Sequence, residues 1–453
     1  MDHDRQISFA GARMDESPLT WAQQIMWGAI KRRAPFDPAF NIGHVERIPG
    51  ACTLGAFCES LQAVTEDFDV LRTRFPANTS GMPRQVVEQY GSISLRVVDA
   101  PARAARETAD AIRDELVKER FEYATEMPVR YAVVTTDDHP AYLVVSASHL
   151  AFDYQGVLCL AERIKNRTNG NETRRTYDVL HPCDQARFEA SPQGRAESDR
   201  SLEYQAGVLS SFPVTNFPTR LPERRDAGIL RAAVKSPVAS LAVARLAHQH
   251  GVSPSAVYVA AMAFAIAKLA NDPRCIMSVM SSNRYRRRYR QYVGLISQGI
   301  LIGIDVDPMS FSETIARSWQ ACLAGYLHSR YNPPDFEALL RAAERKQGHD
   351  VAVAFFNDRI GGTGGSAGIS TEPGPDIRAL RGRTKITRLP SPEAGGFRFH
   401  LAVQGRRSNP ELMLSVDTSY VSVNDVGALF LACESVLIEA ATEGANREIP
   451  LKI

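Results

Sequence analysis

The chain has 453 residues, of which 44% are hydrophobic and 23% are charged, an ordinary composition for a globular protein with room for two domains. Its formal net charge is only +2, which argues against broad electrostatic attraction to nucleic acid or to an anionic membrane. The seven cysteines are scattered without a CxxC pair, so we expect reduced thiols in a cytoplasmic protein, with neither a disulfide framework nor a metal site.

No secretory or membrane-spanning segment is predicted. The first 17 residues are polar and lack the apolar core of a signal peptide. The most apolar segment, Ser255–Ala270, is shorter than the ~20 residues that a membrane span needs. Because it is hydrophobic nearly all round, it predicts a helix buried inside a globular unit.

Residues 1–175 are predicted to form an N-terminal unit of mixed helices and strands. Helical periodicity occurs at Leu19–Ile30, Leu54–Phe68 and Ala104–Glu119, and β-rich runs occur at Gln85–Val87, Ser94–Val98, Arg130–Asp137 and Ala141–His149. The last two runs predict an antiparallel hairpin with its turn at Asp138-His139-Pro140, followed by a helix that begins after Asp153.

Residues 176–228 are polar and rich in charge, and they predict a linker that contains one helix near 195–209. A second α/β unit is expected over residues 229–453. Its predicted helices are Val238–His250, Pro254–Ala270, Phe311–Ser329, Phe336–Gln347 and Val423–Thr442, and its strands are Ile229–Lys235, Cys275–Ser281, Gly299–Val306, Val351–Phe356, Phe397–Gln404 and Leu412–Asp417. The glycines of Gly361–Gly368 predict an irregular crossing loop near 358–396.

The run from Ser148 to Gly156 joins the predicted hairpin to the predicted helix and carries His149 and Asp153. An imidazole fixed at a strand end can point into a cleft, and with an ordinary pKa of ~6.5 it exchanges a proton near neutral pH. The structural alternative is that His149 is only hydrogen-bonded and that Asp153 is the N-cap of the helix. These residues alone leave both interpretations open.

This run resembles the active-site signature His-His-x-x-x-Asp-Gly of the condensation domains of nonribosomal peptide synthetases, which belong to the chloramphenicol-acetyltransferase-like superfamily. The second His is kept as His149 and the Asp as Asp153, whereas Ser148 stands for the first His and Tyr154 for the Gly. Further segments resemble the family in the same order: Leu19–Trp27, Val70–Phe75, Ser281–Arg284, Tyr292–Gln298 and Phe355–Asn357. Together they cover almost the whole chain, and their number and order carry the resemblance.

The resemblance implies a mixed α/β fold in which two chloramphenicol-acetyltransferase-like lobes form a V-shaped pseudo-dimer with a central tunnel. His149 would be the catalytic residue, either as the general base or as the group that positions the nucleophile. Asp153 would pair with Arg284 to hold the active-site architecture, and the position of Ser148 is mainly structural in the family.

Three further side chains would bind substrate by the same resemblance: Tyr154, Asn357 and Gln298. A Gly beside the catalytic His lets the backbone turn freely, whereas Tyr154 adds bulk at the tunnel. This change would alter the choice of substrate or abolish activity.

The predicted function is that of an acyltransferase, a free-standing condensation enzyme of nonribosomal peptide and antibiotic biosynthesis. It would join a carrier-bound acyl or aminoacyl thioester to an amine or hydroxyl acceptor. It would bind no cofactor, because the substrate arrives on the phosphopantetheine arm of an acyl or peptidyl carrier protein supplied in trans. Two alternatives stay open: an inactive module that recruits a partner to a synthetase, and an acyltransferase that uses a coenzyme A thioester or aminoacyl-tRNA.

The densest charge cluster of the chain is Arg284–Arg290, which contains five arginines and two tyrosines. A solvated loop is the plain interpretation. Contact with an acidic carrier protein or its phosphate is a second, and contact with tRNA is a third, since Arg and Tyr can neutralise phosphates and stack on bases. The low net charge argues against extensive binding of nucleic acid.

Overall fold

The computed structural model describes residues 2–34, 37–48, 50, 52–79, 81–171, 179–217, 221, 228–307, 310–360, 377–380, 382–390, 398–406 and 409–443. The chain divides into two compact units. Unit 1 contains Met1–Ala196 and Ser282–Ser297, and unit 2 contains Glu197–Ser281 and Gln298–Ile453. The chain therefore enters unit 1 twice. The predicted domain boundaries, the V shape and the tunnel stay predictions.

Unit 1 is built on a five-stranded sheet with the strand order β1-β6-β7-β8-β3. Its strands are β1 (Asp2–Ala10), β3 (Ile42–Arg47), β6 (Tyr90–Asp99), β7 (Val129–Thr136) and β8 (His139–Ala147). The β6–β7 pair is parallel and the other pairs are antiparallel. A smaller sheet has the order β2-β5-β4, with β2 (Asp15–Pro18), β4 (Thr73–Arg74) and β5 (Arg84–Val87).

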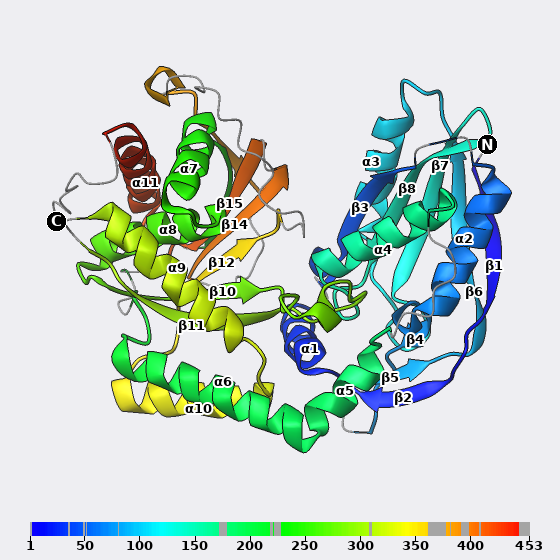
Figure 1. The fold of residues 1–453 in the computed structure, drawn as a ribbon, viewed down its shortest axis with the longest axis horizontal. Coiled ribbons are helices and arrows are strands. Elements are labelled where there is room, and N and C mark those ends of the chain that lie inside the picture. Colours follow the sequence, from blue (N-terminus) through cyan, green and yellow to red (C-terminus); the bar gives the residue numbers. More distant parts are fainter. Residues whose placement is uncertain are drawn as a thin grey trace. The chain divides into compact units, whose positions relative to one another are not determined.

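Helices cover both faces of the five-stranded sheet (Figure 1). The helices of unit 1 are α1 (Trp21–Arg33), α2 (Leu54–Asp67), α3 (Ala105–Leu116), α4 (Tyr154–Thr168) and α5 (Pro182–Ala190), with short 3₁₀ turns at Asp37–Phe40, Asp69–Arg72 and Arg287–Tyr289. Helices α2 and α4 bury their apolar sides with Val133 and Val145, and α3 buries its own with Ala132 and Val134. Because side chains alternate along a strand, these two sets lie on opposite faces.

The hairpin before the candidate site has a tighter turn than the sequence predicted. The turn residues are Asp137 and Asp138, with φ of 51° and 63°, and His139 and Pro140 already belong to β8. Two positive φ values in a row define the two-residue turn whose twist matches that of the strands, and Asp tolerates this conformation better than most residues do. The predicted turn at 138–140 was therefore wrong, because Pro140 was taken as part of the turn.

Unit 2 is built on a seven-stranded sheet with the order β11-β10-β12-β14-β15-β9-β13. Its strands are β9 (Ile229–Lys235), β10 (Arg274–Ser281), β11 (Gln298–Asp305), β12 (Ala354–Asp358), β13 (Lys385–Leu389), β14 (Phe399–Arg406) and β15 (Asn409–Asp417). Its helices are α6 (Pro192–Ser211, which begins in unit 1), α7 (Pro237–His250), α8 (Pro254–Ala270), α9 (Phe311–Leu327), α10 (Pro333–Gln347) and α11 (Val423–Glu443), with a 3₁₀ turn at Ile377–Leu380. The predicted mixed α/β class is confirmed.

Helix α8 lies at the centre of unit 2, as its sequence predicted. Every residue from Ala256 to Ala267 is buried, and α7, α9 and α11 contribute to the same core on one face of the sheet (Figure 1). Helices α6 and α10 pack against the other face, where Val208 of α6 meets Leu301 of β11. Both faces of the sheet therefore bear helices.

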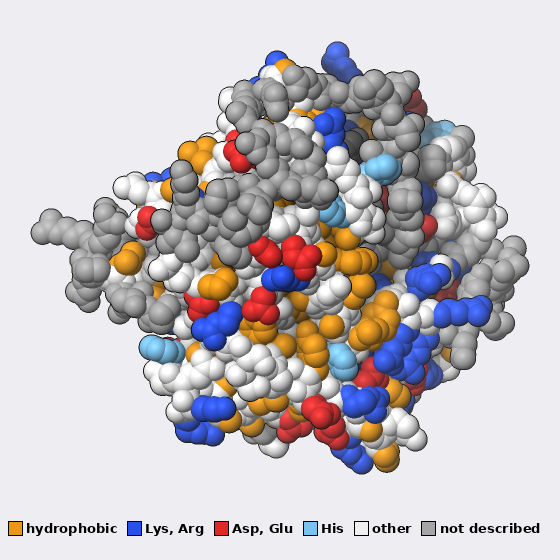
Figure 2. All heavy atoms as spheres, turned by 60° about the vertical axis from the view of Figure 1, so that its left-hand side comes forward, with side chains coloured by type: hydrophobic (Ala, Val, Ile, Leu, Met, Phe, Trp, Pro, Cys, Tyr) orange, Lys and Arg blue, Asp and Glu red, His pale blue; other side chains and the backbone are white. Residues whose placement is uncertain are grey.

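No single helix among the described residues is long and apolar enough to cross a membrane; α7 and α8 pass that test only as a pair, which is bent by 111°. All seven cysteines are free thiols. Figure 2 shows one face of the molecule, on which hydrophobic side chains lie among charged side chains of both signs. This mixture agrees with the net charge of +2.

The predicted linker at 176–228 contains more structure than one helix. Helix α5 precedes α6, and α6 covers the helix predicted near 195–209. Much of the predicted crossing loop near 358–396 lies outside the described residues, including all of Gly361–Gly368.

Candidate active site

His149 lies in a tight turn between β8 and α4, two residues beyond the end of the strand. The turn is closed by the carbonyl oxygen of Ser148, which accepts hydrogen bonds from the N–H groups of Ala151 and Phe152 at 3.0 and 3.1 Å. Leu150, Ala151 and Phe152 are fully buried, whereas His149 is half-buried. The turn therefore anchors its apolar residues in the core and presents the imidazole at its edge.

One ring nitrogen of His149 is fixed by the backbone. Its Nδ1 lies 2.7 Å from the carbonyl oxygen of Phe152. Because a carbonyl oxygen only accepts hydrogen bonds, Nδ1 carries the proton in this contact, and neutral imidazole then has an unprotonated Nε2. This arrangement sets the tautomer and orientation that a general base requires.

Asp153 caps α4 and binds a second chain segment at the same time. Its Oδ1 accepts a hydrogen bond from the N–H of Gly156 at 2.7 Å, which is the N-cap contact that the structural alternative predicted. Its Oδ2 accepts hydrogen bonds from the N–H groups of Ile296 and Ser297, each at 3.1 Å. The carboxylate thus joins the start of α4 to the segment Ser282–Ser297.

Arg284 is the charged partner of Asp153, and both residues are buried. Its guanidinium lies 2.8 Å from Oδ1 and 2.9 Å from Oδ2 of the carboxylate, and it donates further hydrogen bonds to the carbonyl oxygens of Ser282, Tyr292 and Gly294. Burial by itself would raise the pKa of Asp153, but the charge of Arg284 and the hydrogen bonds that the carboxylate accepts from Arg284, Ile296 and Gly156 hold that pKa below its usual value. The structure therefore brings Asp153 and Arg284 together as a charged pair.

The backbone of the segment approaches α4 closely at one glycine. A Cβ on Gly156 would lie 2.4 Å from the carbonyl oxygen of Gly294, and the N–H of Asp153 donates to that oxygen at 3.4 Å. Gly294 itself has a φ of +150°. The close approach thus requires a glycine at position 156, two residues after Tyr154.

Ser148 and Tyr154 stand where the family signature has His and Gly. Ser148 is buried, and its Oγ accepts a hydrogen bond from the N–H of Leu150 at 3.3 Å, which fits a structural position. Tyr154 is the first residue of α4, with 38% of its surface exposed and its ring edge-on to His44 at a centroid distance of 6.5 Å. The side chain therefore stands at the surface of unit 1 beside the turn that carries His149.

His44 extends the candidate site in a way that the sequence did not reveal. It belongs to β3, and its Nε2 lies 3.2 Å from Oε2 of Glu46, whose Oε1 accepts from Lys165 at 2.7 Å. The hydrogen bond with His44 lowers the pKa of Glu46, burial opposes this effect, and the contact with Lys165 lowers it further. No local pattern predicted β3, so the sequence could not place His44 beside Tyr154.

Two predicted substrate-binding residues, Gln298 and Asn357, belong to unit 2. Gln298 begins β11, is buried, and donates a hydrogen bond from Nε2 to the carbonyl oxygen of Tyr331 at 3.1 Å. Asn357 is half-buried near the end of β12, and its alternation with Phe356 places it on the sheet face opposite the core of α8. Their contact with substrate stays a prediction.

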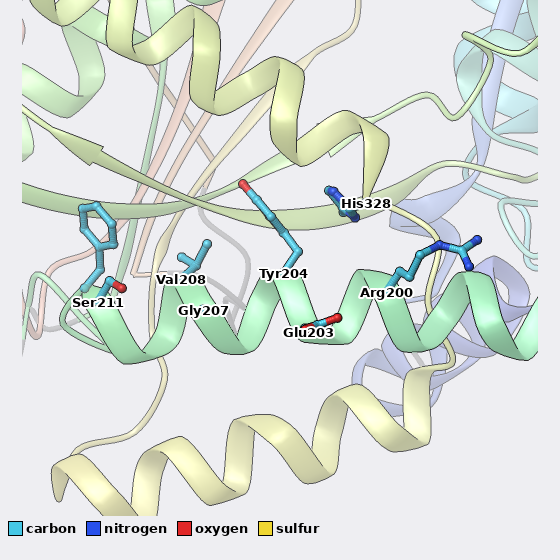
Figure 3. A pocket seen from close by; sticks show the side chains of 8 residues that line it. Arg200, Glu203, Tyr204, Gly207, Val208, Ser211 and His328 are labelled. Carbon is cyan, nitrogen blue, oxygen red and sulfur yellow. The ribbon is translucent and has the colours of Figure 1, made fainter.

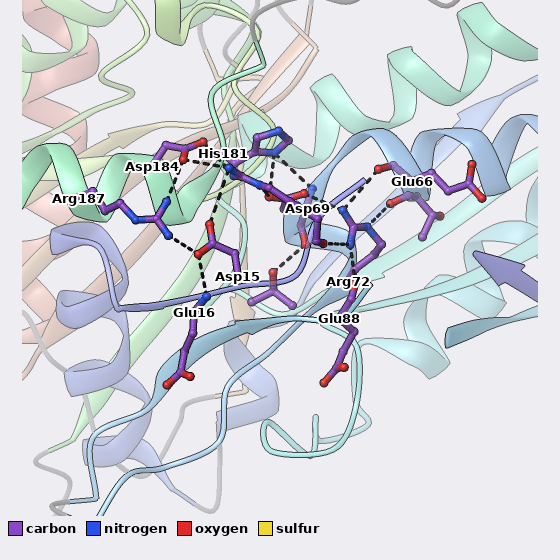
Figure 4. Close-up of polar contacts among 12 residues, drawn as sticks. Asp15, Glu16, Glu66, Asp69, Arg72, Glu88, His181, Asp184 and Arg187 are labelled. Atoms are coloured by element: carbon purple, nitrogen blue, oxygen red, sulfur yellow. Dashed lines mark hydrogen bonds and ion pairs between the residues drawn. The ribbon is translucent and has the colours of Figure 1, made fainter. Parts of the chain in front are cut away.

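A buried charge network explains the segment Val70–Phe75, for which the sequence suggested no role. Arg72 is wholly buried, with its guanidinium bound to Asp69 and to the backbone carbonyl oxygens of Thr65, Glu66, Arg13 and Glu88 (Figure 4). Asp69 and Asp184 also bind Arg13, and Arg187 binds Asp15 and Asp184. These contacts fix α5 to the region of β2 and β5. Helix α5, which belongs to the predicted linker, is therefore a fixed part of unit 1.

Unit 2 has a hollow of about 570 Å³ between α6 and the end of α9. Figure 3 shows Tyr204 of α6 beside His328, and the two rings stack with centroids 4.8 Å apart. None of the predicted site residues lines this hollow. Within the described ranges, no group of three or more His, Cys, Asp or Glu side chains is arranged to hold a metal ion.

Comparison with protein families gives a match to the condensation domain over residues 13–364. The chain belongs to the condensation-domain family. Condensation domains are acyltransferases that form amide bonds, and the family predicted from the sequence is therefore confirmed.

Relatives of this chain include nonribosomal peptide synthetases. An isonitrile lipopeptide synthase of Mycobacterium tuberculosis is 26% identical over 337 residues, which cover 70% of this chain and 13% of that protein. The chain thus spans a small part of this relative's length.

Solved structures of condensation domains share the fold of this chain. The condensation domain of the monacolin K polyketide synthase MokA superposes with a TM-score of 0.72 at 15% identity, covering 96% of this chain and 99% of that one. A variant of the starter condensation domain of rhizomide synthetase RzmA, solved in complex with C8-CoA, gives a TM-score of 0.69 at 17% identity and covers 97% of both chains. The chloramphenicol-acetyltransferase-like fold predicted from the sequence is thereby confirmed.

Proposed function

We propose that this protein condenses an acyl or aminoacyl thioester, carried on the phosphopantetheine arm of a carrier protein, with an amine or hydroxyl acceptor. Membership of the condensation-domain family supports an acyltransferase, and the relatives support a role in natural-product biosynthesis. The free thiols agree with a reducing, cytoplasmic setting. No cofactor is needed, because the thioester is already activated.

The observation that carries the proposal is the hydrogen bond between His149 Nδ1 and the Phe152 carbonyl oxygen. It leaves Nε2 as the proton acceptor on a half-buried ring. The acceptor amine attacks the thioester carbonyl carbon, the new C–N bond forms, and the C–S bond breaks. His149 Nε2 takes the proton that the amine loses and returns it to the departing sulfur, which leaves as the phosphopantetheine thiol.

Asp153 and Arg284 take no part in this proton transfer in our proposal. Their contacts are with each other and with the backbone, so they position the turn and the segment Ser282–Ser297. Ser148 has the same kind of role inside the turn. Tyr154, at the start of α4, limits the size of the substrate near His149, and Asn357 and Gln298 contact substrate from unit 2.

The first experiment is an acyl-transfer assay read by intact-protein and product mass spectrometry. Acyl-loaded carrier proteins and coenzyme A thioesters are offered with a panel of amines and alcohols. The rhizomide starter domain was solved with C8-CoA, so the coenzyme A arm tests the second donor class directly. We expect transfer from carrier protein and little from coenzyme A.

His149→Ala is expected to lower kcat by about 10²–10⁴-fold, the usual value of general acid–base help, with little change in melting temperature. His3→Ala is the matched control, because it removes an exposed imidazole from β1, which lies at the edge of the sheet opposite β3. Equal rates for wild type and His149→Ala would remove the proton-transfer role. Carrier binding without product from any pair would favour the recruiting module, for which the replacement of Gly by Tyr154 is the supporting observation.

A further inference from the structure

The segment Ser282–Ser297 is rigidly held by unit 1 on its inner side. Tyr289 is fully buried, and its hydroxyl donates to Oε1 of Gln185 at 3.0 Å. Tyr292 and Ile296 are buried with it, and Leu180 packs against them. Asn283, in the left-handed conformation with a φ of 55°, donates from Nδ2 to the carbonyl oxygen of Ile296 at 2.9 Å. The segment therefore closes on itself and on α5.

The outer side of the same segment carries arginines. Arg287, Arg288 and Arg290 are exposed, in contrast to the buried Arg284. Arg288 is held by its aromatic neighbours, with its guanidinium 4.4 Å from the ring centre of Phe188 and 4.5 Å from that of Tyr289. Because the backbone that carries these side chains is already fixed, binding a partner costs little backbone conformational entropy.

This positive charge is not compensated locally. Among the residues that the structure describes, Arg287 and Arg290 form no ion pair, whereas Arg187 on the adjoining α5 pairs with Asp15 and Asp184. The segment from Arg284 to Arg290 carries five arginines, of which Arg284 is neutralised by Asp153. Since the whole chain has a net charge of only +2, the rest of the chain has no positive excess.

We propose that Arg287, Arg288 and Arg290 form a docking surface for the acidic face of the carrier protein that delivers the thioester. Carboxylates of the carrier, and the phosphate that joins it to its pantetheine arm, are the groups that this surface would bind. The inference rests on the proposed function, in which the donor is a carrier-bound thioester. The inference adds a docking surface for the carrier protein, and this surface lies on the segment Ser282–Ser297, which also contains Arg284.

The size of the surface favours a small acidic protein over RNA. Residues 287–290, even if they were fully extended, would span about 14 Å, which is enough for a few charge contacts. Extensive nucleic-acid binding is typical of domains with a basic stripe and a strongly positive net charge. The low net charge of this chain, and the neutralisation of Arg284, leave only the short cluster available.

The test uses the full chain and a fluorescently labelled, acidic holo carrier protein of the fatty-acid type. Binding is followed by anisotropy at low and at physiological salt. Wild type is expected to bind and to weaken with salt, and Arg287→Ser/Arg290→Ser is expected to bind about tenfold more weakly, since exposed charges at a rim contribute modestly. Circular dichroism and thermal melting establish that the variant is folded.

Arg103→Ser/Arg106→Ser, at the start of α3, is the matched control, because both side chains are exposed and it removes the same charge from unit 1. We expect it to bind as wild type does. Equal binding by the two double variants, or no binding by wild type, would overturn the proposal. Displacement of the carrier by unfractionated tRNA that binds more tightly would assign the surface to RNA instead. The measurement needs no turnover, so docking without product would count against the proposed reaction alone.

Discussion

Unit 1 contains two buried charge clusters that are built in opposite ways. In the first, the carboxylate of Asp153 is the centre, and it accepts from Arg284 and from the N–H groups of Gly156, Ile296 and Ser297. In the second, the guanidinium of Arg72 is the centre, and it donates to Asp69 and to several backbone carbonyl oxygens. Each centre satisfies backbone groups that no regular secondary structure pairs.

The difference follows from the ends of the chain segments that meet in each cluster. The start of α4 and the end of the segment Ser282–Ser297 present unpaired N–H groups, which need an acceptor. The end of α2, the residue after β5 and the loop residue Arg13 present carbonyl oxygens, which need donors. Each buried charge thus lies where it forms hydrogen bonds with backbone groups that lack a partner in regular secondary structure. The opposite charge beside it offsets the free-energy cost of removing it from water. Only the first cluster adjoins His149, so the two should differ in their effect on activity.

The largest effect is expected from Asp153→Ala. It leaves Arg284 buried without its carboxylate and removes the acceptor of three N–H groups, so we expect a loss of about 3–5 kcal/mol in the free energy of unfolding, with activity lost as well. Urea denaturation and the acyl-transfer assay measure the two losses.

Asp153→Asn is the companion variant, because the amide oxygen keeps an acceptor for α4 but loses the charge. We expect a smaller loss of stability than for Ala. If Asp153→Ala were as stable and as active as wild type, the cluster would have no architectural role.

Arg72→Lys should be nearly as destabilising but should spare the chemistry. A lysine keeps the positive charge but cannot reach carbonyl oxygens on several sides as the planar guanidinium does. Two or more buried carbonyl groups would lose their partners, which predicts a loss of about 2–4 kcal/mol. We expect kcat to be unchanged when the acyl-transfer rate is divided by the concentration of folded protein and is measured below the melting temperature. A tenfold drop in kcat with intact folding would erase the distinction between the clusters.

Gly156→Ala tests the close contact beside the first cluster. The added methyl would lie 2.4 Å from a backbone oxygen, so α4 or the segment Ser282–Ser297 must shift. Overpacking of this kind costs about 1–3 kcal/mol and moves the turn that holds His149. Gly207→Ala in α6, where a Cβ meets nothing within 4 Å, is the control. A variant with wild-type melting temperature and rate would show that the contact relaxes freely.

The smallest effect is expected from pH. Because the pKa of Asp153 is lowered in the folded protein, its contribution to stability is present above the ordinary value of 3.8 and is lost as the pH falls through the lower folded value. The difference in unfolding free energy between wild type and Asp153→Asn should therefore narrow in acid, by at most about 1.4 kcal/mol per pH unit. Chemical denaturation on both sides of pH 3.8, down to the lowest pH at which both proteins stay folded, measures it, and a difference independent of pH would contradict the assignment.

The sequence predicted best the elements whose pattern is local. Helix α8 begins and ends at the predicted residues because Ser253 caps it and Asn271 ends it in the left-handed conformation. Strand β1 was missed because only Ile7 and Phe9 are buried, and it is held by pairing with the distant β6. Strand β3 was missed because none of its residues is fully buried and it is held by pairing with the distant β8, and the placement of His44 was missed with it.

The candidate site shows the same division between local and distant information. The resemblance placed His149, Asp153 and Arg284 in their segments, and the contact between the last two is seen in the structure. The hydrogen bond that fixes the His149 tautomer depends on the conformation of one turn. No pattern of residues in the sequence predicts that conformation. The burial of Arg72 depends on backbone groups from three separate segments, which sequence periodicity cannot bring together.

The chain passes between the two units three times, after Ala196, after Ser281 and after Ser297. Dividing the chain at one position therefore cannot give a fragment that contains all of either unit. A fragment that ends at Ala196 would contain Asp153 but lack Arg284. Anyone who wishes to exchange one half of such a domain for that of a relative must move residues 282–297 together with the first half. Three junctions, after Ala196, Ser281 and Ser297, are therefore the natural boundaries for a chimera.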